Sequence, residues 1–324
     1  MTSSALIRVQ NLRKLYPYKG KFFGRRTFVK AVDNVSFEIR RGEIYGLAGE
    51  SGSGKSTLGE LLVNLQRPTS GRILLNGQEV ESYRKKALQE FRRRVQIVFQ
   101  DPYQSLDPRF TVLGTVLEPL NIHKIGSLAT REKKAIDTLQ SVGLRPPERY
   151  LAKLPGELSG GERQRLCIAR ASVLDPRFLV ADEPVSMLDV SIRAGILELL
   201  KRLKEEKNVT VLFISHDLAT IGYLTDRTAI MYMGQIVEEG PTLEILRNPL
   251  HPYSQALISA VPSPNPDVKR REVKAKGIIP DPIDLPSGCR FSSRCEYSHD
   301  QCAIEEPSFR DVSEDHRVAC HYQS

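Results

Sequence analysis

The sequence predicts an α/β protein, because short apolar runs typical of buried strands alternate with helical patterns. One such run, Ile44–Ala48, leads directly into the glycine-rich stretch Gly49–Thr57. Another, Phe178–Ala181, ends in two adjacent carboxylates, Asp182 and Glu183. Open parallel sheets bind ligands at the carboxyl ends of their strands, so these two positions are the first candidates for a functional site.

The glycine-rich stretch predicts a phosphate-binding loop. It has the pattern G-x-x-x-x-G-K-S and lies between a predicted strand and a predicted helix, whose leucines are Leu58, Leu61, Leu62 and Leu65. Glycines let backbone N–H groups close around phosphate oxygens, and the following helix points its positive end at the anion. Lys55 can reach the β- and γ-phosphates, and the Ser56 hydroxyl is the natural Mg²⁺ ligand. The residues expected at the nucleotide are Gly49, Ser51, Gly52, Gly54, Lys55, Ser56 and Thr57.

Composition describes a soluble globular protein with one large domain and a smaller one. The chain has 324 residues, of which 27% are charged and 40% hydrophobic. It has no apolar run long enough for a membrane span and no signal-peptide pattern near Met1, so we expect it in the cytosol. The formal charge of +8 allows a nucleic-acid or anionic membrane partner, but the basic residues are scattered.

The N-terminal part predicts antiparallel strands, and the middle predicts an inserted helical block. Alternating apolar residues mark strands between residues 6 and 40, interrupted by a polar insert, Pro17 to Arg26, that follows Tyr16. Residues 71–77 form another strand and turn, and Val95–Phe99 forms a strand that ends at Gln100. The pattern from 112 to about 150 is helical, so we expect a subdomain there.

Three later stretches contain residues that could bind nucleotide or take part in a reaction. Ser159 can cap the helix expected over Arg165 to Val173, with Glu162 completing a capping box. Asp182 and Glu183 suit a metal-binding aspartate followed by a base that activates water. His216 follows the buried strand Val209–Ser215 and is a candidate contact of the γ-phosphate. A hairpin around Gly234 and helices near 242–247 and 253–260 are expected to close the domain.

Together these motifs resemble those of ATP-binding cassette (ABC) ATPases over residues 6–260. They are similar, in order and spacing, to Walker A, Q-loop, signature, Walker B, D-loop and H-loop motifs: Gly49 to Ser56, Gln100, Leu158 to Glu162, Phe178 to Glu183, Asp189 and His216. The resemblance implies a P-loop NTPase fold, an ABC-type nucleotide-binding domain with a RecA-like core, an antiparallel β subdomain and an α-helical subdomain at about 101–170. Three further stretches resemble the oligopeptide/dipeptide importer ATPases, in particular the second of their two paralogous ATPases. They are Val98–Pro108, His251-Pro252-Tyr253 and a C-terminal cysteine-rich extension, 261–324.

The resemblance also implies roles for individual residues. Two domains would dimerise head to tail, with ATP held by Lys55 and Ser56 of one subunit and capped by Ser159, Gly160 and Gly161 of the other. Asp182 would hold Mg²⁺, Glu183 would be the general base and Gln100 would contact Mg²⁺ or the water. His216 would contact the γ-phosphate and Tyr16 would stack on adenine. Met187 departs from the small residue usual before Leu188, but it alters no chemical group.

The leading functional hypothesis is the ATP-hydrolysing subunit of an importer for peptides or a related solute. Such a subunit would lie peripherally on the cytoplasmic face of the membrane. Its partners would be a paralogous ATPase, favoured as a heterodimer, two transmembrane permease subunits and an external solute-binding protein, with no nucleic acid. The alternative is a soluble ABC ATPase acting on nucleic acid or ribosomes. A third hypothesis is a regulatory protein that binds ATP without hydrolysing it, but the intact Glu183 and His216 disfavour that hypothesis.

The tail carries four cysteines with the spacing C-x5-C-x6-C-x17-C: Cys289, Cys295, Cys302 and Cys320. In a cytosolic chain this cluster favours a metal over disulfides. Zinc is one reading, with His299, His316 and His321 as further ligands, although no C-x2-C pair is present. Resemblance to peptide-importer ATPases favours a 4Fe–4S cluster, and free thiols are the last reading. A proline-rich crossing segment with the basic run Lys269-Arg270-Arg271 precedes it, and Cys167 is expected to be a buried helix residue.

Overall fold

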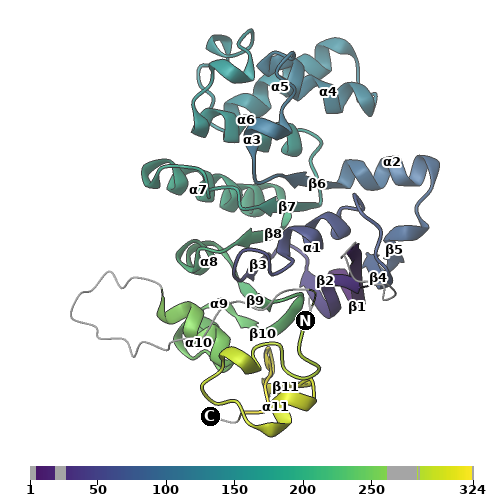
Figure 1. Cartoon of the computed structure of the whole chain (residues 1–324). Coiled ribbons are helices and arrows are strands. Elements are labelled where there is room, and N and C mark those ends of the chain that lie inside the picture. The colour runs from purple at the N-terminus through teal and green to yellow at the C-terminus, as the bar shows by residue number, and fades with distance from the viewer. Residues whose placement is uncertain (1–4, 19–26, 261–282, 284, 323–324) are drawn as a thin grey trace. The chain divides into compact units, whose positions relative to one another are not determined.

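The computed structural model describes residues 5–18, 27–260, 283 and 285–322. These residues form two compact units. Figure 1 draws the elements of the chain. The first unit contains residues 40–43 and 82–214, and the second contains 5–39, 44–81 and the chain from 215 onward. The basic run Lys269-Arg270-Arg271 and most of the insert from Pro17 to Arg26 lie outside the described residues.

The sheet of the first unit is parallel and buried. Strand β7 (Phe178–Asp182) pairs with β6 (Val95–Val98) on one side and with β8 (Thr210–Ser215) on the other. Every residue of β7 is buried, as expected for a parallel strand covered on both faces. Because the strands are parallel, their carboxyl ends meet at one edge, where Asp182 lies opposite Ile214. The strands predicted in this region are therefore confirmed.

Helices surround this sheet, and four of them form a separate block. In Figure 1 the block contains α3 (Pro102–Ser105), α4 (Val112–Ile122), α5 (Leu128–Ser141) and α6 (Gly160–Ser172). Helix α6 packs against each of the other three, which agrees with the helical block predicted from the sequence. The remaining helices of the unit are α2 (Lys85–Arg94), which the sequence analysis did not predict, and α7 (Val190–Lys207).

Helix α6 begins five residues earlier than predicted. Its first residue is Gly160 rather than Arg165, because the predicted capping box forms at Ser159. The Ser159 hydroxyl accepts the backbone N–H of Glu162 at 3.3 Å, and the Glu162 carboxylate accepts the N–H of Ser159 at 2.8 Å. Two otherwise unpaired helix donors are thereby satisfied. Cys167 on this helix is buried, as expected.

The second unit contains the predicted antiparallel subdomain. Strand β1 (Ala5–Tyr18) lies between β2 (Thr27–Arg40) and β4 (Ser70–Leu75), and β5 (Gln78–Glu79) pairs with β4. The pairing of β1 with β4 and of β4 with β5 is antiparallel. Short 3-10 turns elsewhere in the chain lie at Val80–Ser82, Pro147–Arg149, Pro155–Glu157 and Ser292–Arg294.

Further paired strands of this unit join the glycine-rich loop to the C-terminal tail. Strand β3 (Ile44–Ala48), which precedes the loop, runs parallel to β9 (Arg227–Tyr232). Beyond β9 the order is β10 (Gln235–Pro241), β12 (His316–Ala319) and β11 (Phe309–Ser313), all antiparallel. The helices of the unit are α1 (Lys55–Leu62), α8 (Leu218–Leu224), α9 (Thr242–Arg247), α10 (Pro252–Ser259) and α11 (Asp300–Ile304).

Buried carboxylates on β10 anchor the tail to this sheet. The Glu238 carboxylate is fully buried and accepts the N–H groups of Leu250 and His251 at 2.9 and 3.0 Å. It also bonds Nε2 of His316 at 2.8 Å. The neighbouring Glu239 pairs with Arg227 and Arg317. A buried charge is tolerated only when it is paired and hydrogen-bonded in this way, so the tail is an integral part of the second unit.

Candidate functional site

The glycine-rich loop joins β3 to α1 and has a backbone that only glycine tolerates at two points. Gly49 has φ 153° and Gly54 has φ 104°. A Cβ atom would lie 2.1 Å from the Met231 carbonyl oxygen at the first position and 2.0 Å from that of Ala31 at the second. Gly52 has φ 77° with no atom within 4 Å of a built Cβ. The predicted glycine requirement therefore comes from close packing at the ends of the loop.

Lys55 lies at the start of α1 with its ammonium group inside the loop. Its Nζ donates to the carbonyl oxygens of Gly49 and Glu50 at 2.9 and 2.8 Å, and to Oγ of Ser53 at 3.3 Å. Gly54 stands at the N-cap and offers no side-chain acceptor to the first N–H groups of the helix. A cation and helix N–H groups at one loop form a site suited to an anion such as phosphate. Ser56 is exposed beside this loop, and Thr57 is partly exposed.

Two further predicted residues also belong to the second unit. Tyr16 lies near the end of β1, half-buried, with its hydroxyl bonded to Oε1 of Gln66 and the Lys14 ammonium 5.0 Å from its ring centre. His216 follows β8 directly and is exposed. The next residue, Asp217, caps α8 by accepting the N–H of Ala219 at 2.9 Å.

In the first unit, the structure brings Gln100 and Glu183 together. Gln100 follows β6 by two residues and donates from Nε2 to the Glu183 carboxylate at 3.1 Å. Glu183 follows β7 with a left-handed backbone, φ 43°, and its N–H donates to the Ile214 carbonyl at 2.9 Å. A non-glycine residue in this conformation is strained, and such strain is concentrated at functional sites. Asp182, at the end of β7, is buried.

The predicted signature residues lie at the N-terminus of α6. Ser159 is exposed although it caps the helix, and Gly160 is partly exposed. Gly161 is buried against α7, where a Cβ atom would lie 2.6 Å from Ile192 Cγ2. The N-terminus of α6 thus presents a serine and a glycine to solvent. Met187, the departure noted in the sequence, is 58% exposed and fills no buried space.

The structure does not support the predicted metal centre in the tail. Among the described residues, no group of three or more His, Cys, Asp or Glu side chains could hold a metal ion. His316 bonds Glu238, and Nε2 of His321 lies 3.0 Å from the Glu305 carbonyl oxygen, so two of the histidines considered for zinc have protein partners. A backbone hydrogen bond nevertheless joins Cys289 and Cys302. The N–H of Cys289 donates to the Cys302 carbonyl oxygen at 2.8 Å.

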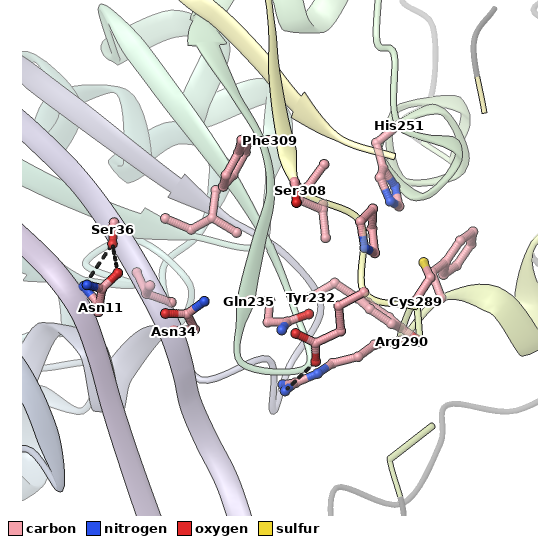
Figure 2. Close-up of a pocket in the computed structure, with 17 residues that line it drawn as sticks. Asn11, Asn34, Ser36, Tyr232, Gln235, His251, Cys289, Arg290, Ser308 and Phe309 are labelled. Carbon is pink, nitrogen blue, oxygen red and sulfur yellow. Dashed lines mark hydrogen bonds and ion pairs between the residues drawn. The ribbon is translucent and has the colours of Figure 1, made fainter. Parts of the chain in front are cut away.

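The tail also borders a cavity of about 350 Å³ in the second unit (Figure 2). Tyr232, Gln235, His251, Cys289 and Arg290 line it together with residues of β1 and β2. Burial lowers the pKa of His251 to about 4, with the Glu238 carboxylate opposing this effect, so the imidazole is neutral. Its Nδ1 accepts the N–H of Tyr253 at 3.0 Å, and its Nε2 has no hydrogen-bond partner within the described part of the chain.

Two contacts of the phosphate-binding loop are not predictable from the sequence. Glu50, inside the loop, donates its N–H to the Tyr253 hydroxyl and pairs through its carboxylate with Arg294 of the tail. In the sequence, His251-Pro252-Tyr253 indicates only a subfamily, and no motif includes Arg294. The partners are 203 and 244 residues apart in sequence, so no local pattern could have linked them.

Comparisons with known proteins agree with these features. Residues 32–186 match the ABC transporter family, and residues 237–302 match the C-terminal region of oligopeptide/dipeptide transporters. The oligopeptide transport ATP-binding protein AppF of Bacillus subtilis is 42% identical over 98% of both chains. The probable peptide ABC transporter ATP-binding protein y4tS of Sinorhizobium fredii is 44% identical over 99% of this chain and 91% of that protein. The solved dimeric cassette MJ0796, bound to ADP and Pi, has a TM-score of 0.65 at 31% identity, covering 73% of this chain and 98% of that one.

The fold and the phosphate-binding loop thus define an ATP-hydrolysing cassette of the P-loop type. The chain belongs to the ABC transporter family, as one of the ATP-binding subunits with the C-terminal region of oligopeptide/dipeptide transporters. Within the described residues, no helix combines the length and apolar character needed to cross a bilayer.

Proposed function

We propose that this chain hydrolyses ATP to energise the uptake of peptides through separate permease subunits at the cytoplasmic face of the membrane. The single observation that carries the proposal is the match of residues 237–302 to the C-terminal region of oligopeptide/dipeptide transporters. Relatives of nearly the same length are named peptide or oligopeptide transport ATP-binding proteins, which supports the same cargo. The alternative of a soluble ATPase acting on nucleic acid or ribosomes gains no support from these relatives.

The proposal assigns nucleotide binding to the loop residues and to Tyr16. Lys55 pairs with the β- and γ-phosphates, the loop N–H groups of Gly49, Ser51, Gly52 and Gly54 contact phosphate oxygens, and Tyr16 stacks on adenine. Ser56, Gln100 and Asp182 would supply the hydroxyl, amide and carboxylate oxygens that Mg²⁺ prefers, and Thr57 follows Ser56 in the chain. When bound, Mg²⁺ neutralises charge that develops on the phosphates.

The proposal assigns hydrolysis to Glu183. Its carboxylate takes a proton from water as the water oxygen bonds to the γ-phosphorus, and the bond from that phosphorus to the bridging oxygen breaks to give ADP and phosphate. The 3.1 Å hydrogen bond from Gln100 supports this role, because it holds the carboxylate in one orientation. His216, exposed after β8, contacts the γ-phosphate.

We further propose a head-to-tail dimer with a paralogous ATPase, in which Ser159, Gly160 and Gly161 cap the partner's ATP. The exposure of Ser159 at the N-terminus of α6 supports this, because a helix N-terminus attracts phosphate. The permeases would dock on the helical subdomain at about 101–170, within a nucleotide-binding domain of residues 1–260. Tyr103, Phe110 and Ile122 are large apolar side chains exposed there. An external solute-binding protein would deliver the cargo.

Peptide uptake tests this proposal directly. Cells lacking the gene for this chain should fail to accumulate a radiolabelled tripeptide, and the wild-type gene should restore uptake. A Glu183→Gln gene, expressed to the same level, should not. Normal uptake in the deletion strain, with no competing peptide transporter induced, would contradict the assigned cargo while leaving the ATPase assignment intact.

For the tail, residues 261–324, we propose a 4Fe–4S cluster held by Cys289, Cys295, Cys302 and Cys320, with zinc as the alternative. The supporting observation is the gathering of four cysteines in the tail. Burial raises the pKa of Cys289 to about 11, and thiolate charge at the other three cysteines raises it further. Burial likewise raises the pKa of Cys320 to about 11, with Cys295 and Cys302 adding to the effect. Thiols so placed cannot all ionise unless a cation offsets their charge.

Metal analysis of the anaerobically purified chain tests the tail proposal. Iron and sulfide at about four per chain, lost in a Cys302→Ser variant, would support the cluster. Zinc in place of iron would support the alternative. A metal-free chain with four reactive thiols would refute both readings, without affecting the ATPase assignment.

A further inference from the structure

The C-terminal tail contacts the phosphate-binding loop through one arginine. Nη1 and Nη2 of Arg294 lie 3.1 and 3.3 Å from the two carboxylate oxygens of Glu50, a forked pairing. Arg294 is 8% exposed, and the Glu50 side chain is 29% exposed. A paired charge this deeply placed is screened less by water than a surface ion pair, so the contact fixes one geometry.

An aromatic cluster holds the guanidinium in place. Arg294 lies 5.8 Å from the ring centre of Tyr232 and 5.7 Å from that of Phe291, and Nη1 reaches the Tyr232 hydroxyl at 3.4 Å. The Tyr232 ring packs on the rings of Tyr253 and Phe291, with its centre 4.5 Å and 5.4 Å from theirs. Residues of β9, α10 and the tail therefore determine together where the positive charge stands.

Glu50 is held at its backbone N–H, its carbonyl and its carboxylate as a result. Its N–H donates to the Tyr253 hydroxyl at 2.9 Å, its carbonyl accepts Nζ of Lys55 at 2.8 Å, and its carboxylate pairs with Arg294. Glu50 lies between Gly49 and Ser51, so its negative charge stands inside a loop that is assigned to an anion. An uncompensated carboxylate there would repel a triphosphate and would compete for the Lys55 ammonium.

We propose that Arg294 is a positioning residue for nucleotide binding. It neutralises the Glu50 carboxylate and fixes the phosphate-binding loop in the form that accepts ATP, with Tyr253 fixing the adjacent backbone. This inference rests on the proposed assignment of the loop to ATP. It gives the tail a role in the ATPase cycle, although the tail lies outside every ATP motif of the sequence.

The affinity of the full-length chain for ATP with Mg²⁺ tests the proposal through four variants. Arg294→Ala should raise the Kd roughly three- to tenfold, because the Glu50 charge is left uncompensated. Glu50→Gln alone supplies the remaining corner of the double-mutant cycle, and in the Arg294→Ala background the same change should restore most of the lost affinity. Arg310→Ala, which removes another tail arginine that bonds the Tyr322 carbonyl, is the matched control and should bind as wild type does.

Steady-state ATPase kinetics supply a second readout. Arg294→Ala should raise KM while kcat stays within about twofold, because the chemical groups are untouched. Should Arg294→Ala fail to fold, Arg294→Gln keeps a hydrogen-bonding side chain, lacks the charge and has the same expected Kd.

Three outcomes are decisive. Wild-type affinity in a folded Arg294→Ala chain would overturn this inference alone. A double variant no tighter than Arg294→Ala would also overturn it, because lost packing rather than charge would then explain the effect. A wild-type chain that binds no ATP would overturn the proposed function and this inference together.

Discussion

Gln100 and Glu183, 83 residues apart in sequence, are joined by a hydrogen bond of 3.1 Å between Nε2 and Oε2. The bond connects the loop that leads into the helical block with the carboxylate assigned as the general base. Parallel pairing of β6 with β7 brings the two strand ends to the same edge. The Glu183 carboxylate is therefore oriented by a residue at the start of the loop that leads into the helical block.

Removing that hydrogen bond should slow ATP turnover. In Gln100→Ala the Glu183 carboxylate loses its orienting donor, and we expect kcat to fall about ten- to a hundredfold. Gln104→Ala, on the neighbouring helix α3, should leave kcat unchanged. An undiminished kcat in Gln100→Ala would show that Glu183 is oriented by other groups.

The phosphate-binding loop should tolerate a methyl group at Gly52 better than at Gly54. Both residues have positive φ, but only at Gly54 would a Cβ atom meet a backbone carbonyl, 2.0 Å from the Ala31 oxygen. We expect Gly52→Ala to lower the free energy of unfolding by about 1 kcal/mol and Gly54→Ala by at least about 3 kcal/mol. Urea unfolding would measure both values, and equal losses would contradict the packing argument.

The tail should lose its anchor when the buried Glu238 carboxylate is removed. In Glu238→Ala, His316 and the N–H groups of Leu250 and His251 lose their common acceptor. We expect a loss of about 3–5 kcal/mol in the free energy of unfolding. Glu244→Ala, an exposed glutamate on α9, is the control and should cost less than about 0.5 kcal/mol. Equal losses would mean that the Glu238 network does not anchor the tail.

The free energy of unfolding should fall as the pH is lowered, because His251 is held neutral in the folded chain. Its folded pKa of about 4 lies below the unfolded value near 6.5, so the unfolded chain binds the extra proton first. The stability from a neutral His251 is thus full above pH 6.5 and is lost as the pH falls toward 4, by about 2–3 kcal/mol.

His251→Asn isolates this contribution. Asparagine keeps an acceptor at the N-cap of α10 but does not titrate. The difference in unfolding free energy between wild type and variant should therefore change between pH 6.5 and 4. Parallel stability curves over that range would show that His251 is not held neutral.

Local patterns predicted most of the fold, and contacts between distant segments account for what they missed. The loop at Gly49–Thr57 and the carboxylates after β7 were predictable because strand, turn and helix signals lie side by side in the chain. Helix α2 was missed because most of its residues are polar and only Phe91 is buried. The Arg294–Glu50 pair was missed because only the folded sheet brings the tail to the loop.

The candidate metal centre shows the limit of reading residue types alone. Four cysteines predicted a cluster, and family resemblance favoured iron and sulfur. The described side chains form no metal-binding group, and two nearby histidines bond protein acceptors instead. The sequence therefore indicates which thiols could take part, and metal analysis of the purified chain is the test of the proposed cluster.

The most direct test of the account measures ATP binding and ATP turnover in the purified chain and in Glu183→Gln. Loss of the general base should lower kcat by about 10²–10⁴ while ATP still binds, because glutamine keeps the size of the side chain but cannot take the proton. Glu198→Gln, on helix α7, should hydrolyse ATP as wild type does. Turnover near the wild-type rate in Glu183→Gln would contradict the assignment of this carboxylate, and with it the proposed hydrolytic mechanism.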